Sequence, residues 1–169
     1  MDLSVIKLAK QEYEDMCNVF DSLEKKRVVD SPSGSMKLRD VLRMDVANYL
    51  VYLSASDGQI DPNEVMVYQM ITGMKNDAEE IKEFIEENNI YSASFGSTVP
   101  ASLKIAVEAE YRIVMVTGET ITFPEQVIRL FEKIGQVLIE ADGGVTESER
   151  KDYNAYIETL KEHLRNRGF

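Results

Sequence analysis

The chain has 169 residues with one Cys and one His, and its 30 Asp and Glu residues against 19 Lys and Arg residues give a formal net charge of −11. A balance this acidic excludes nonspecific attraction to nucleic acid or to an anionic membrane surface, and it favours a cation or a basic protein surface as partner. One Cys and one His also exclude a disulfide framework and a structural zinc site of the Cys/His kind. Hydrophobic residues make up 44% of the chain, which is typical of a globular domain with its own core.

The sequence shows no targeting or membrane-spanning pattern. Residues 1–5 lack the basic and apolar regions of a signal peptide. No window approaches the roughly 18 apolar residues that a membrane span needs. We therefore expect a cytoplasmic protein with no transmembrane segment.

Apolar residues recur at helical spacing along most of the chain, and this predicts an all-α fold, a compact bundle of about seven helices in a single domain covering residues 1–169. In chain order, the predicted helices cover 4–26, 38–53, 61 to about 74, 77–87, 100 to a break at 118, 122–138 and 146–165. Residues 27–35 contain a Pro and a Gly and are expected to form a loop. Residues 89–100 are expected to form an ordered connection.

Several single residues are interpreted from their place on these helical stripes. Cys17 is expected to be a buried core thiol, and Tyr111 is expected to face inward. His163 lies off its apolar stripe and is expected at the surface. The methionines on or near the stripes are interpreted as core filler, namely Met16, Met44, Met66, Met70 and Met74.

One motif occurs twice in the chain, which predicts an internal pseudo-repeat. Ser56–Glu64 aligns with Ala141–Glu149 at an offset of 85 residues, and the Asp, the Gly and the final Glu are identical in the two copies. Each copy has a predicted helix before it and another after it. On this basis copy one covers about 38–88 and copy two about 123–165, separated by the connection 89–100.

The local chemistry of each copy predicts a helix, a tight turn and a second helix. A Gly that adopts the left-handed conformation ends the first helix, and a capping residue with a Glu three positions later begins the second. These three residues are Gly58, Asp61 and Glu64 in copy one, and Gly143, Thr146 and Glu149 in copy two. This interpretation leaves Asp57 and Asp142 without a structural role.

A metal site is the second interpretation of the same spacing. Residues 57–64 fit the last eight positions of an EF-hand loop, but Leu53 and Ala55 occupy its first two ligand positions and exclude a complete EF-hand. Each copy thus supplies at most part of the coordination sphere of a divalent cation such as Ca²⁺ or Mg²⁺. Two alternatives stay open: the carboxylates are helix caps only, or the two copies share a cation.

The repeated motif resembles the tellurite-resistance TerB-like family of helical domains. The resemblance covers roughly 38–164 and implies an all-helical fold, no catalytic activity, no organic cofactor and a role in stress or metal-resistance assemblies. It also implies a divalent-cation site, for which the positions carried over are Asp57, Asp61, Glu64, Asp142 and Glu149. Asp45 and Glu132, on the preceding helices, are weaker candidates.

A second resemblance points to a partner. The stretch 89–103 is similar to a helical region found before the ATPase module of some bacterial AAA-family proteins, whereas this chain has no Gly-x-x-x-x-Gly-Lys-Ser/Thr loop. We therefore weigh three functions: a non-catalytic cation-binding module for protein assembly, a metal-free adaptor for a basic partner such as an AAA-family ATPase, and a carboxylate-based hydrolase. The hydrolase has the least support, because the chain has no nucleophile elbow, phosphate loop or two-His metal helix.

Overall fold

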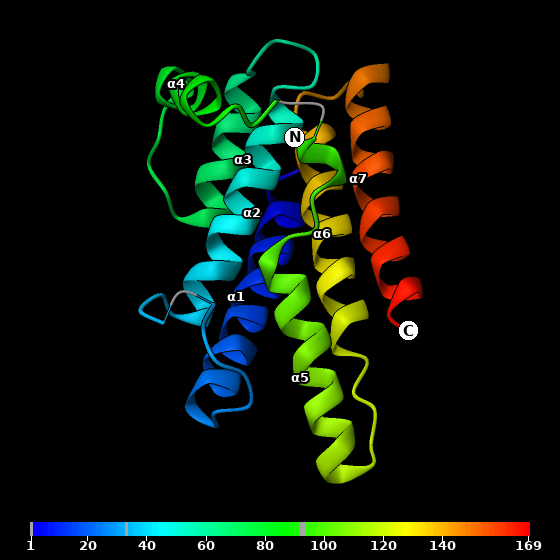
Figure 1. Cartoon of the computed structure of the whole chain (residues 1–169). Helices are drawn as coiled ribbons and strands as arrows, with labels where there is room; N and C mark the ends of the chain where they lie inside the picture. Colours follow the sequence, from blue (N-terminus) through cyan, green and yellow to red (C-terminus); the bar gives the residue numbers. More distant parts are fainter. Residues whose placement is uncertain (1, 33, 92–93) are drawn as a thin grey trace.

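The computed structural model describes residues 2–32, 34–91 and 94–169, and this part of the chain folds into α-helices joined by short connections (Figure 1). In chain order the helices are α1 (Leu3–Lys25), α2 (Leu38–Ser54), α3 (Pro62–Thr72), α4 (Ala78–Asn88), the short 3₁₀ helix η1 (Phe95–Ser97), α5 (Ala101–Thr117), α6 (Phe123–Ile139) and α7 (Glu147–Asn166). The predicted all-α fold with seven helices is confirmed for the described residues. Ser33 of the expected loop and Ser92 and Ala93 of the expected connection lie outside them.

The apolar stripes of these helices meet in one core. Helix α1 packs against α2, α3 and α6, and α6 also contacts α5 and α7. Cys17 is buried on the core side of α1, as its position on the stripe predicts. Burial of these stripes is the main favourable contribution to folding, since short helices in water gain little stability from their own hydrogen bonds.

An aromatic cluster joins the first half of the chain to the second. The ring of Tyr49 on α2 lies 5.2 Å from that of Phe131 on α6 and 4.5 Å from that of Tyr156 on α7, measured between centroids. Tyr49 reaches this position because Gly135 on α6 has no side chain: a Cβ there would lie 2.1 Å from the Tyr49 hydroxyl oxygen. The two copies of the motif are thereby held on one rigid core.

Helix α5 extends beyond the rest of the bundle, as Figure 1 shows. The buried residues of α5 end at Glu110, so the expected inward position of Tyr111 is wrong. Tyr111 is 44% exposed, and its ring contacts that of Phe169 at 5.2 Å. The apolar stripe of α5 continues past Glu110, but the neighbouring helices end before they could cover it.

Two other expectations for single residues have mixed outcomes. Met16 is buried, but Met44 is 40% exposed and is not core filler. His163 is partly exposed, and burial lowers its pKa.

Among the described helices, none combines the length and the apolar character needed to cross a bilayer.

Candidate functional site

The two copies of the motif fold into turns with the same backbone path. In the first, the Gly58 N–H donates to the Ala55 carbonyl at 3.1 Å, and in the second the Gly143 N–H donates to the Glu140 carbonyl at 3.2 Å. Both glycines have positive φ, +80° and +89°, in the left-handed region that other residues rarely adopt. Gly is therefore needed at both positions for the chain to leave one helix and start the next.

Asp57 and Asp142, which the sequence leaves without a role, stabilise these turns. The Asp57 Oδ1 accepts a hydrogen bond from the Gln59 N–H at 2.9 Å, and the Asp142 Oδ1 accepts one from the Gly144 N–H at 2.9 Å. This is the Asx-turn geometry, in which a short carboxylate side chain holds the backbone two residues ahead. The same contact in both copies accounts for the identical Asp.

Each turn then begins the next helix with a capping box. The Asp61 Oδ1 accepts from the Asn63 N–H at 2.7 Å, and the Glu64 Oε2 accepts from the Asp61 N–H at 2.9 Å. In the second copy the Thr146 Oγ1 accepts from the Glu149 N–H at 3.2 Å, and the Glu149 Oε2 accepts from the Thr146 N–H at 2.6 Å. The helix-cap role predicted for these four residues is therefore present in the structure.

The closing glutamates of the two boxes are buried. Glu64 and Glu149 are each 4% exposed, whereas Asp57 and Asp142 are exposed to solvent. Burial and the negative charges of Glu149, Asp57 and Asp61 together raise the pKa of Glu64 to about 8, against the hydrogen bond from the Asp61 N–H, which lowers it. The electrostatic environment of Glu64 therefore includes a carboxylate of the second copy.

Tyr91 links the first turn to helix α7, which follows the second turn. Its hydroxyl oxygen lies 3.1 Å from the carbonyl oxygen of Ser56, in the first turn, and 3.2 Å from Oδ2 of Asp152, in the helix that follows the second. The α2–α3 and α6–α7 connections accordingly lie at the same end of the bundle (Figure 1). We call this region the acidic end and define it by Asp57, Asp61, Glu64, Asp142 and Glu149. In the described chain none of these five residues forms an ion pair.

The acidic end does not by itself complete a cage for Ca²⁺. That ion takes about 6 to 8 oxygen ligands, and the described residues contain no group of three or more Asp, Glu, His or Cys placed to hold a metal. Each of the five carboxylates also accepts a hydrogen bond from a backbone N–H through one of its oxygens. Each buried carboxylate could pair with one positive charge that keeps other ligands of its own, such as a hydrated cation or a Lys or Arg side chain.

The weaker metal candidates lie apart from this site and have structural partners. Asp45 accepts a hydrogen bond from the Ser102 N–H at 2.7 Å and so caps the start of α5. Burial raises the pKa of Asp45. Glu132 pairs with Lys161 at 2.5 Å. None of the residues of the acidic end lines the surface pockets found beside α1, α2, α5 and α7 in the described chain.

Comparison with models of protein families, with curated proteins and with solved structures finds no match for this chain.

Proposed function

We propose that this chain is a non-catalytic helical assembly module whose acidic end binds a positively charged group of a protein partner. The supporting observation is that both copies of the motif lie at one end of the bundle, with Glu64 and Glu149 buried there and the charge of Glu149 contributing to the raised pKa of Glu64. With a pKa of about 8, the Glu64 carboxyl is mostly protonated at neutral pH in the free chain. A Lys or Arg side chain placed beside it would favour the ionised carboxylate and form a charged pair with it.

The TerB-like resemblance belongs to the same proposal. It rests on the repeated Asp-Gly motif and would place the module in stress or tellurite-resistance assemblies. The partner we favour is a basic surface of a separate protein, and an AAA-family ATPase is the candidate suggested by the stretch 89–103. Because all five carboxylates hold backbone N–H groups in turns and helix caps, an interaction module is favoured over an enzyme.

A divalent cation shared by the two copies is the second candidate. Glu64 and Glu149 each use Oε2 for the capping box, so Oε1 of each is the oxygen that could face a cation. Two such oxygens could hold Ca²⁺ or Mg²⁺ only together with water or carbonyl oxygens, since Mg²⁺ in particular binds through one or two carboxylates and retains several waters. A chelator would abolish binding of a divalent cation but would leave binding of a Lys or Arg side chain unchanged.

Thermal unfolding of the full chain separates the two candidates. The melts are recorded in EDTA, in millimolar Ca²⁺, in millimolar Mg²⁺, and in EDTA with a Lys-rich peptide. A ligand at about 100 times its Kd adds about 2.7 kcal/mol to the free energy of unfolding, which raises the Tm of a chain this long by about 5–10 °C. We expect the peptide to raise the Tm in EDTA; a rise with a cation alone would favour the second candidate.

The chain supplies a matched control for this experiment. Glu80 closes a third capping box, in which its Oε2 accepts from the Asp77 N–H at 2.9 Å, but it is exposed and lies outside the acidic end. Glu64→Gln should abolish the ligand-induced rise, whereas Glu80→Gln should leave it unchanged. No rise with any of the three ligands, or an equal rise in both variants, would contradict the proposed function.

A further inference from the structure

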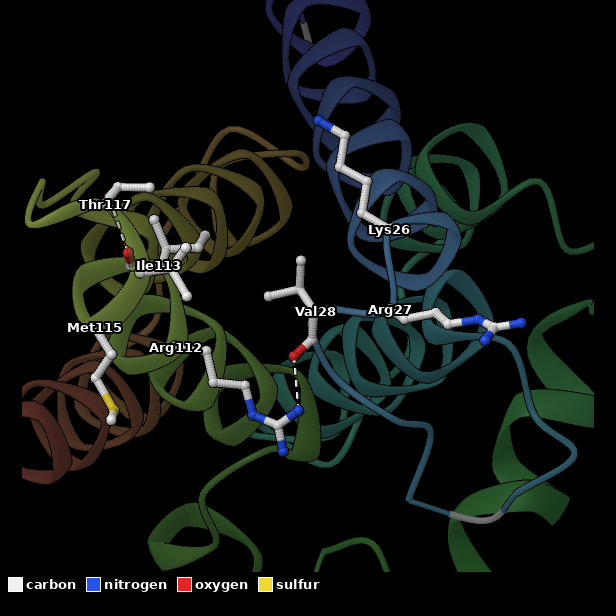
Figure 2. Close-up of a pocket in the computed structure, with 8 residues that line it drawn as sticks. Lys26, Arg27, Val28, Arg112, Ile113, Met115 and Thr117 are labelled. Carbon is white, nitrogen blue, oxygen red and sulfur yellow. Dashed lines mark hydrogen bonds between the residues drawn. The ribbon is translucent and has the colours of Figure 1, made fainter.

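A groove lies at the opposite end of the bundle, between the end of α1 and the last turns of α5 (Figures 1 and 2). Its volume is about 460 Å³. It is lined on one side by Lys26, Arg27 and Val28, and on the other by Arg112, Ile113, Met115, Val116 and Thr117. The size is within the range of pockets that hold the side chains or small ligands of a binding partner.

Two apolar side chains of this groove lie almost entirely in water, whereas Val28 and Ile113 pack partly against the core. Met115 and Val116 are each 86% exposed, the highest values among the large hydrophobic residues of the described chain. Figure 2 shows Ile113 and Val28 facing each other across the groove. Adjacent apolar side chains left in water at a concave surface are typical of a binding site for another molecule.

The groove is already formed in the free chain. Arg112 donates a hydrogen bond to the Val28 carbonyl at 2.9 Å, which ties α5 to the chain segment after α1. The buried carboxylate of Glu110, on α5, accepts hydrogen bonds from the N–H groups of Ile121 and Phe123 at 2.7 and 3.0 Å. These contacts fix the connection between α5 and α6. The exposed apolar residues are therefore carried by an anchored helix rather than by a loose loop.

The charge of the groove is opposite to that of the protein. Three of its lining residues are cations and none is acidic, although the chain has a net charge of −11. In the described chain Lys26 and Arg27 form no ion pair, whereas Arg112 is already paired with Glu108 on α5. Arg27 has φ of +53°, a left-handed conformation that a Gly would adopt at lower cost. Figure 2 shows Lys26 and Arg112 on either side of Val28, with Arg27 extending away from α5.

We propose that this groove docks an acidic amphipathic helix of a protein partner. The apolar face of that helix would cover Met115 and Val116 and the exposed parts of Val28 and Ile113, and its carboxylates would pair with Lys26 and Arg27, the two cations of the groove that form no ion pair in the described chain. This is the helix-in-groove mode of recognition, in which apolar anchors recur at i, i+3, i+4 and i+7.

The test uses the full chain and a fluorescent helical peptide of about 18 residues, with Leu at the four anchor spacings and Glu on the opposite face. We expect saturable binding by fluorescence anisotropy, with little binding of a peptide carrying Lys in place of Glu. Met115→Ser with Val116→Ser should weaken binding at least about tenfold. The matched control is Leu8→Ser, which removes an apolar side chain that is 54% exposed on α1 and should leave binding unchanged.

Arg27→Gly provides a charge variant that does not endanger the fold. Because Gly suits the left-handed backbone at this position, we expect the Tm to stay the same or rise while the peptide binds more weakly. No binding of the acidic peptide, or binding that the Met115 and Val116 changes do not weaken, would overturn the proposal. The proposal would also be overturned if the peptide does not bind but the chain dimerises or binds phosphatidylserine vesicles, and the same variants abolish that dimerisation or vesicle binding. Glu64→Gln should not affect peptide binding, so this test is independent of the acidic end.

Discussion

Glu64 combines a structural role with an electrostatic cost. Its Oε2 completes a helix cap, while burial and the charges of Glu149, Asp57 and Asp61 raise its pKa to about 8 from an ordinary value of 4.5. The folded state thus holds the Glu64 proton more tightly than the unfolded state does. This contribution to stability is present below about pH 4.5 and is lost as the pH rises towards 8.

The pH dependence of unfolding tests this directly. Between about pH 5 and pH 9 we expect the free energy of unfolding to fall by a few kcal/mol, at about 1.4 kcal/mol per pKa unit. Glu64→Gln keeps an oxygen for the Asp61 N–H but cannot ionise, so its urea-unfolding free energy should depend less on pH and exceed that of the wild type at high pH. A Glu64→Gln profile parallel to that of the wild type and of Glu80→Gln would count against the buried charge.

Gly135 and Tyr49 form a second pair whose contact can be measured. Gly135→Ala adds a Cβ that would lie only 2.1 Å from the Tyr49 hydroxyl oxygen, and we expect a loss of about 1–3 kcal/mol. Tyr49 is fully buried, and its hydroxyl has no hydrogen-bond partner in the described chain. Tyr49→Phe alone should therefore be neutral or stabilising, and in combination it should recover part of the Gly135→Ala loss. A double variant whose loss is the simple sum of the two single effects would contradict this packing.

At this scale the sequence predicts local contacts well and distant ones poorly. The capping pairs span three residues and are visible as a spacing. The partners of Glu110 and Asp45 are not, because the first reaches amides 11 to 13 residues ahead and the second an amide 57 residues ahead. The contact of Asp57 is local, because its side chain accepts from an N–H only two residues ahead. The sequence still does not predict this contact, because an Asp at the end of a helix is not a common capping signal.

At the scale of helices, the boundaries follow from signals within the chain. Capping boxes start α3, α4 and α7, and the structure shows all three. The direction in which a residue faces depends instead on what lies opposite. Tyr111 continues the apolar stripe of α5, but the neighbouring helices end before it, so periodicity predicts the helix correctly and the burial incorrectly.

Glu110 tests how the connection between α5 and α6 is held. Its buried carboxylate accepts from three backbone N–H groups, those of Ile121, Thr122 and Phe123. Glu110→Ala should cost about 3 kcal/mol, because three backbone N–H groups, one of them in the buried Phe123, lose a charged acceptor. Amide exchange at these three positions should become faster. The control is Glu119→Ala, an exposed residue in the same connection, which should change stability by less than about 0.5 kcal/mol. Equal effects of the two variants would show that Glu110 does not hold this connection.

At the scale of the whole molecule, the bundle separates two surfaces of opposite character. The acidic end lies where α2 meets α3 and α6 meets α7, and the groove lies at the other end, beside the end of α1 and the last turns of α5 (Figure 1). A rigid core lies between them, since the rings of Tyr49, Phe131 and Tyr156 tie α2, α6 and α7 together. Such an arrangement would let one module hold a basic partner and an acidic partner at the same time.

A titration of Glu64 decides whether the two turns form one site for positive charge. Its apparent pKa is followed by ¹³C NMR of the carboxyl group, with and without a Lys-rich peptide in EDTA. We expect a value of about 8 in the free chain and a fall of at least about one unit when the peptide binds, because a nearby positive charge favours the ionised carboxylate. Glu149→Gln should also lower the value in the free chain. A pKa near the ordinary 4.5 in the free chain, or one that the peptide leaves unchanged, would contradict the proposal that the two turns act together.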